Sequence, residues 1–72
     1  MRKIEYTGYV VRDTVKRQYL DTDSPRGTRW GRLAEGTIYA KEYDAIRTAF
    51  AINRDAGDER AHVVPIKLFK RI

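Results

Sequence analysis

The chain has 72 residues, which suffices for one small domain and leaves no room for a second. It contains no cysteine, so disulfides and cysteine zinc sites are excluded and packing must hold the fold, as in proteins of a reducing cytoplasm. Fifteen Lys and Arg against ten Asp and Glu give a net charge of +5, which favours nucleic acid, anionic lipid or acidic protein surfaces as partners. No apolar run approaches the roughly 18 residues of a membrane span, so we expect a chain that is not inserted in a membrane and has no membrane partner.

The first 20 residues predict a β hairpin. Residues 3–12 are rich in aromatic and β-branched side chains, which predicts a first strand with Gly8 as a bulge or a point of close approach. Turn-forming residues follow, and the alternation of charged and bulky side chains over residues 16–20 predicts a short second strand.

The segment from Ser24 to Arg32 reads Ser-Pro-Arg-Gly-Thr-Arg-Trp-Gly-Arg. Its proline and two glycines predict a loop rather than a strand or a helix. After this loop, the β-prone residues 37–40 predict a third strand that leads directly into a helix.

Residues 42–55 predict a helix. Apolar side chains recur at spacings of one, three and four and share one face, namely Ala45, Ile46, Ala49, Phe50 and Ile52. Acids in the first turn and Arg54 in the last turn oppose the two ends of the helix dipole, and Gly57 is placed to end the helix in a left-handed conformation. We expect the apolar face to be core, with Phe50 as its largest side chain.

Residues 61–69 are β-branched and apolar and predict a last strand. Pro65 has no amide hydrogen, so this strand is expected at an edge of the sheet or to bend at Pro65. Together the elements predict a single α+β domain over residues 1–72, in which a small antiparallel sheet of three to four strands packs on one α-helix. One helix covers one face of a sheet, so the other face is expected to be open to a partner or to a second copy in a homodimer.

No residues form a recognisable catalytic or metal-binding pattern. His62 is the only histidine and lacks clustered carboxylates, so it is read as an ordinary strand residue. Glu42 and Asp44 are two residues apart, so they do not face each other on a helix, and the dipole explains them. We therefore expect a non-enzymatic protein without metal or cofactor.

Two sets of residues are candidates for binding. The first is the loop around the only tryptophan, Trp30, where three cations suit contact with a partner: Arg26, Arg29 and Arg32. The alternative is that Trp30 folds into the core and the arginines keep the loop soluble.

The second set comprises cations of the predicted helix, of the last strand and of the residue after it, which could follow a phosphate backbone: Arg47, Arg54, Lys67 and Lys70. The alternative is an ordinary solvated helix face and an edge strand protected by cations.

The order of several segments resembles small bacteriophage-encoded accessory proteins over nearly the full chain. These segments are Tyr-Val-Val-Arg-Asp at 9–13, Gln-Tyr-Leu at 18–20, the tryptophan loop, Thr-Ile-Tyr-Ala-Lys at 37–41, the Ala-rich helix and Val-Val-Pro-Ile-Lys-Leu at 63–68. Several phage proteins of this size bind and disable a host factor, including defence systems such as CRISPR effectors. The resemblance therefore implies a binding protein of the host cytoplasm whose partner is a host protein or ribonucleoprotein. Direct binding of DNA or RNA by the basic loop and helix is the alternative.

Overall fold

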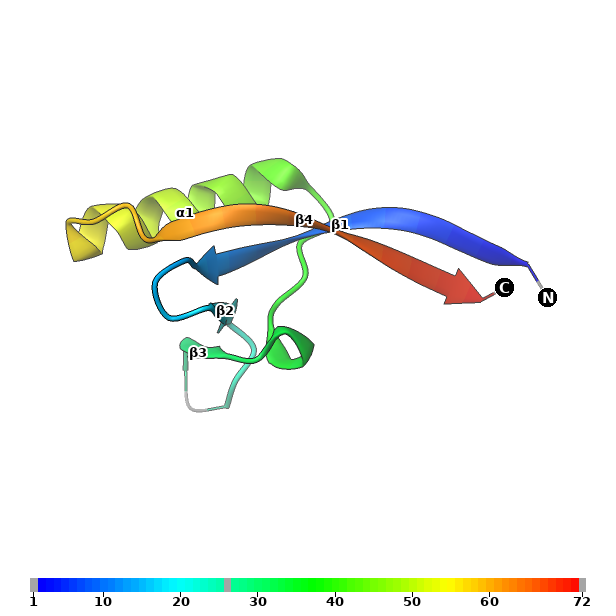
Figure 1. Ribbon diagram of the computed structural model, residues 1–72, viewed down its shortest axis with the longest axis horizontal. Coiled ribbons are helices and arrows are strands. Elements are labelled where there is room, and N and C mark those ends of the chain that lie inside the picture. The colour runs from blue at the N-terminus through cyan, green and yellow to red at the C-terminus, as the bar shows by residue number, and fades with distance from the viewer. Residues whose placement is uncertain (1, 26, 72) are drawn as a thin grey trace.

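The computed structural model describes residues 2–25 and 27–71 and contains four strands, one α-helix and one short 3₁₀ helix. In chain order they are β1 (Lys3–Asp13), β2 (Gln18–Asp21), β3 (Arg29–Gly31), η1 (Leu33–Glu35), α1 (Glu42–Ala56) and β4 (Ala61–Arg71). The strands form one antiparallel sheet in the order β3-β2-β1-β4, and α1 packs on one face of it (Figure 1). The predicted α+β class is confirmed.

A long two-stranded ribbon dominates the shape of the molecule. β1 and β4 pair along their whole length in one unbroken register, whereas β2 pairs only with the last two residues of β1. In the middle of β1, Tyr9 also forms an isolated bridge with Tyr39. In the described chain, residues 3–8 of β1 therefore have β4 on one side and no strand on the other. Figure 1 shows this part projecting beyond α1, with the start of β1 and the end of β4 at its tip. We call residues 2–8 and 66–71 the distal ribbon.

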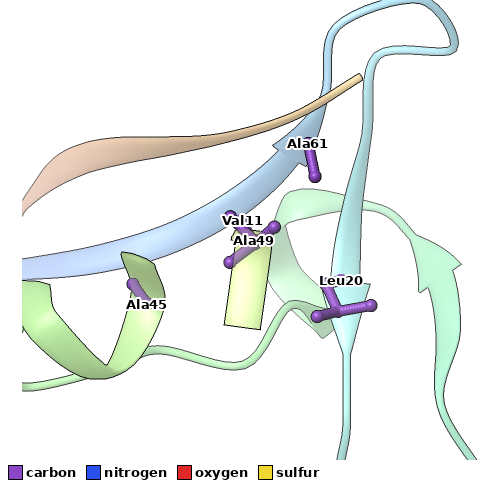
Figure 2. Close-up of a cluster of buried hydrophobic side chains, with 5 residues drawn as sticks. All are labelled: Val11, Leu20, Ala45, Ala49 and Ala61. Carbon is purple, nitrogen blue, oxygen red and sulfur yellow. The ribbon is translucent and has the colours of Figure 1, made fainter. Parts of the chain in front are cut away.

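The core lies where α1 packs on β1 and β4, next to Leu20 of β2. Five buried side chains form its centre, namely Val11, Leu20, Ala45, Ala49 and Ala61 (Figure 2). Larger side chains pack around them, namely Tyr9, Trp30, Tyr39, Ile52 and Val63. Three of the five central residues are alanines, so the helix backbone approaches the sheet closely and a small core suffices.

The helix ends where the sequence indicated, but its buried face is narrower than expected. Gly57 adopts a left-handed conformation with φ of 66° and ends α1, as predicted. Ala45 and Ala49 form the buried stripe, whereas Ile46 is 47% exposed and Phe50 is 68% exposed. The expectation that Phe50 is a core residue is therefore wrong. The short alanine side chains bring α1 so close to the sheet that residues at the margins of the stripe fall outside the contact.

Two strand predictions need correction. The segment 24–32, expected as a loop, contains β3, because Trp30 pairs with Leu20 and packs against the core. The predicted third strand at 37–40 is reduced to the single bridge at Tyr39. Burial of the tryptophan and pairing with β2 outweigh the local turn preference of the glycines.

The remaining strand boundaries agree more closely. β2 begins at Gln18 rather than at residue 16, because Lys16 and Arg17 belong to the turn and Arg17 has a left-handed φ of 55°. β4 lies at the edge of the sheet, which confirms the inference from Pro65.

The face of the sheet opposite α1 is covered near the body of the protein. The side chain of Val11 points to the face covered by α1, and that of Val10 points to the opposite face and is still fully buried. A Cβ atom on Gly8 would lie 2.7 Å from Ile38 Cγ2 and 2.7 Å from Leu68 Cδ1. Since the β1–β4 register has no bulge, Gly8 is the point of close approach, where the chain after η1 crosses the sheet. The expected open face is thus restricted to the distal ribbon.

Candidate nucleic-acid interface

Arg29 and Trp30 of the predicted contact loop make internal contacts. The Arg29 Nε lies 3.3 Å from Asp21 Oδ2, and its guanidinium also pairs with Glu35. Trp30 is half-buried against the core, which is the alternative considered for it from sequence. Arg32 is exposed, and Arg26 lies outside the described residues. Arg29 and Trp30 therefore hold β2, β3 and η1 together, which gives both residues a structural role.

The cations of α1 lie among acids. The Arg47 guanidinium stands 5.7 Å from the centre of the Tyr43 ring, and the Arg54 Nε lies 3.6 Å from an Asp55 carboxylate oxygen. A groove of about 450 Å³ between α1 and the chain around residues 20–28 is lined by Arg47 together with Asp44 and Asp55. This mixture of charges gives the helix little net attraction for an anion.

The distal ribbon, in contrast, concentrates the positive charge of the chain. Its five cations are Arg2, Lys3, Lys67, Lys70 and Arg71, and all are exposed. Its one acid is Glu5, so the ribbon carries +4 of the net +5 of the chain on 13 of its 72 residues. The remaining residues are close to neutral. The cations come from the two ends of the sequence, and the β1–β4 pairing brings them together.

The two faces of the distal ribbon differ in chemistry because successive side chains of a strand alternate between faces. The face on the side of α1 carries Lys3, Glu5 and Thr7 of β1 opposite Arg71, Phe69 and Lys67 of β4. The other face carries Ile4, Tyr6 and Gly8 opposite Lys70, Leu68 and Ile66. We call these the charged face and the apolar face.

On the charged face, cations surround an exposed aromatic ring. Lys3 lies directly opposite Arg71, and Lys67 Nζ lies 3.3 Å from Glu5 Oε1. Phe69 stands between Lys67 and Arg71 along β4 and is 65% exposed. This combination can bind phosphates electrostatically and can stack a base on the ring.

From the predicted set, the structure places Lys67 on the charged face and Lys70 on the opposite face of the same ribbon, and it leaves Arg47 and Arg54 on a different element. Sequence reasoning missed Arg2, Lys3 and Phe69. The sequence carried one indication of them, since cations occur at both ends of the chain, but only the pairing of the first strand with the last makes this meaningful.

A buried acid, Asp13, stands at the end of β1 just before the turn to β2. Asp13 is buried, and its carboxylate accepts hydrogen bonds from the backbone N–H groups of Lys16 and Val15, with Arg60 nearby. The Lys16 N–H bond is the main cause holding the pKa of Asp13 below its ordinary value of 3.8, against the opposing effect of burial. These contacts give Asp13 the role of organising the β1–β2 turn.

Other kinds of site have no support in the part of the chain that the structure describes. Over residues 2–25 and 27–71, no group of three or more His, Cys, Asp and Glu side chains could hold a metal ion. Within those same ranges, no helix has the length and apolarity required to cross a bilayer. Comparison with protein-family models, curated proteins and solved structures gives no match to this chain.

Proposed function

We propose that this protein is a non-enzymatic nucleic-acid-binding protein that contacts phosphates through the charged face of its distal ribbon. The observation that carries the proposal is the charge distribution, because one projecting ribbon holds +4 of the net +5. A cation cluster on a narrow projection attracts a polyanion strongly, because binding releases the counterions condensed on the nucleic acid. A two-stranded ribbon is also a shape that the major groove of DNA admits.

The exposed ring of Phe69 favours single-stranded nucleic acid. An aromatic side chain flanked by cations resembles the surfaces on which unpaired bases stack while the backbone follows the charges. Phe69 is 65% exposed between Lys67 and Arg71. In duplex DNA the bases are already stacked, so the ring would add little. We therefore propose tighter binding to single strands than to duplexes of equal length, without dependence on sequence.

A phage-type inhibitor of a host protein is the second candidate. It is favoured by the exposed side chains on and beside the apolar face, with Ile4 at 47%, Tyr6 at 48% and Ile38 at 49%. Such a surface suits a protein partner better than a nucleic acid. If the protein captures a host factor equally well after nuclease treatment and fails to bind oligonucleotides, this second candidate replaces the first.

The salt dependence of oligonucleotide binding tests the proposal. Fluorescence anisotropy with a labelled single strand, from 50 to 300 mM salt, gives the slope of log K against log salt. Each phosphate contact contributes about 0.7 to this slope for single strands. The Lys3→Gln/Arg71→Gln variant removes two cations of the charged face and should lower the slope by roughly 1.4.

A matched variant on the helix provides the control. Arg47→Gln/Arg54→Gln removes the same amount of charge from α1 and should leave the slope unchanged. Phe69→Leu should weaken binding of single strands without changing the slope, because stacking releases no counterions. Equal slope changes in the two double variants would show that overall charge, rather than the ribbon, determines binding. A larger change for the helix variant would move the interface to α1.

A further inference from the structure

Among the described residues, no strand pairs with the outer edge of β1 in the distal ribbon. Tyr9 donates its N–H to Tyr39 and accepts the N–H of Tyr39, so its backbone groups point away from β4. The unbroken antiparallel register repeats this orientation every second residue. The N–H and C=O groups of Thr7, Glu5 and Lys3 therefore also point away from β4, where the described chain provides no strand.

The outer edge of β4 is protected against the same kind of pairing. The side-chain amide of Asn53 exchanges two hydrogen bonds with the backbone of Ala61, at 2.8 and 2.9 Å, and so occupies the start of this edge. Pro65 has no N–H to offer there. Near its end, antiparallel pairing of two β4 strands brings cations together, for example Lys67 opposite Arg71. Proline and lysine are common means by which proteins keep an edge strand unpaired.

The outer edge of β1 is complementary to itself in one register. When Ile4 lies opposite Ile4 of a second copy in an antiparallel pair, Lys3 of each copy lies opposite Glu5 of the other. Opposite charges directly across two strands stabilise the pairing. Each Lys3–Glu5 pair also joins two residues whose backbone groups point outward, so each pair exchanges two hydrogen bonds.

The neighbouring registers are unfavourable. A register centred on Lys3 places the two Lys3 side chains opposite each other. A register centred on Glu5 places the two Glu5 carboxylates opposite each other. Like charges directly opposite are destabilising. A register centred on Tyr6 would place Lys3 against Tyr9, whose backbone groups are already bonded to Tyr39.

We infer that the protein forms a homodimer through the outer edges of β1, in the register centred on Ile4. The occupant of this edge is a second copy of the chain, because the charges of the edge complement themselves in this register. Pairing converts two projecting two-stranded ribbons into one four-stranded sheet in the order β4-β1-β1-β4. An isolated two-stranded ribbon is only marginally stable in water, whereas three or more strands are stable.

Two charge-reversal variants test the dimer. Lys3→Glu places carboxylates against Glu5 of the other copy, and Glu5→Lys places ammonium groups against Lys3. Each variant alone should be monomeric, with dimer dissociation constants at least tenfold above that of the parent. When the two variants are mixed, every pair across the edge is complementary, and the dimer should return. Sedimentation velocity measures the association. At about 0.15 M salt the Debye length is near 8 Å, so the salt screens the repulsion between the cationic ribbons.

A disulfide tests the register. Ile4→Cys introduces the only thiol, and residues facing each other in a non-hydrogen-bonded pair have Cα atoms about 4.5 Å apart, within the range for a disulfide. Tyr6→Cys is the control, because these positions in the two copies would stand about 13 Å apart along the strands. Rapid oxidation of Ile4→Cys to a covalent dimer, with slow oxidation of Tyr6→Cys, supports the register.

Three results would overturn the inference. They are a parent protein that stays monomeric up to millimolar concentration, a mixture of the two charge variants that stays monomeric, and equal oxidation rates of the two cysteine variants. Circular dichroism of each variant establishes that it is folded. None of these measurements involves nucleic acid, so the dimer and the proposed function stand or fall separately.

Discussion

The difference in burial between Leu20 and Phe50 gives the most direct test of the core. Leu20 is 1% exposed at the centre of the buried cluster, so Leu20→Ala should cost about 2–5 kcal/mol through lost burial and the cavity left behind. Full burial of a Phe side chain contributes roughly 1.5–3 kcal/mol to the free energy of unfolding. Phe50 is 68% exposed, so Phe50→Ala should remove only about a third of that contribution. The higher helix propensity of alanine offsets about 0.5 kcal/mol of that loss.

Thermal unfolding followed by circular dichroism separates the two outcomes. A domain of this size has a total stability of roughly 4–10 kcal/mol, and 1 kcal/mol shifts Tm by about 4–8 °C. Leu20→Ala should therefore lower Tm by more than about 10 °C or unfold the protein, whereas Phe50→Ala should stay within about 4 °C of the parent. A loss for Phe50→Ala as large as that for Leu20→Ala would refute the placement of α1 on the sheet.

Two further predictions concern Gly8, where the distal ribbon meets the rest of the sheet, and Asp13, beside the β1–β2 turn. Gly8→Ala should cost about 1–3 kcal/mol in chemical unfolding, because its Cβ would stand 2.7 Å from Ile38 and from Leu68, and an unchanged midpoint would contradict the crossing at Gly8. Asp13 has a folded pKa below 3.8, so its charge stabilises the fold above about pH 4, and this contribution disappears as the pH falls through the folded pKa. The Tm difference between the parent and Asp13→Asn should accordingly shrink from pH 7 to pH 2.5, whereas a constant difference would assign the effect to the hydrogen bonds alone.

The parts of the fold set by local chemistry could be predicted from the sequence. The end of α1 depends on Gly57, which can adopt a left-handed φ without a steric penalty, and the edge position of β4 follows from the missing amide of Pro65. The close approach at Gly8 was one of two alternatives, and the unbroken register selects it. The inferences from Gly57 and Pro65 need only a residue and its own backbone, whereas the choice at Gly8 needs the pairing with β4.

The parts set by contacts between distant segments could not be predicted. Trp30 lies in a segment with loop composition, and its pairing with Leu20 makes β3 part of the sheet. Phe50 belongs to the apolar periodicity of the helix, but the width of the buried stripe depends on how closely the alanines approach the sheet. For the candidate site, Lys67 was an expected cation, whereas Lys3 joins it on the charged face only because the first strand pairs with the last.

The proposed dimer and the proposed interface reinforce each other through symmetry. When two strands pair edge to edge in one sheet, the twofold axis is perpendicular to the sheet, so equivalent faces of the two copies lie on the same side. The charged faces with Lys67, Phe69 and Arg71 would then form one continuous surface twice as wide, with both apolar faces on the opposite side. A ligand that spans both copies binds the dimer more tightly than the monomer and so shifts the association equilibrium toward the dimer. Binding of a long single strand should therefore depend more steeply on protein concentration than binding of a strand too short to reach the second copy.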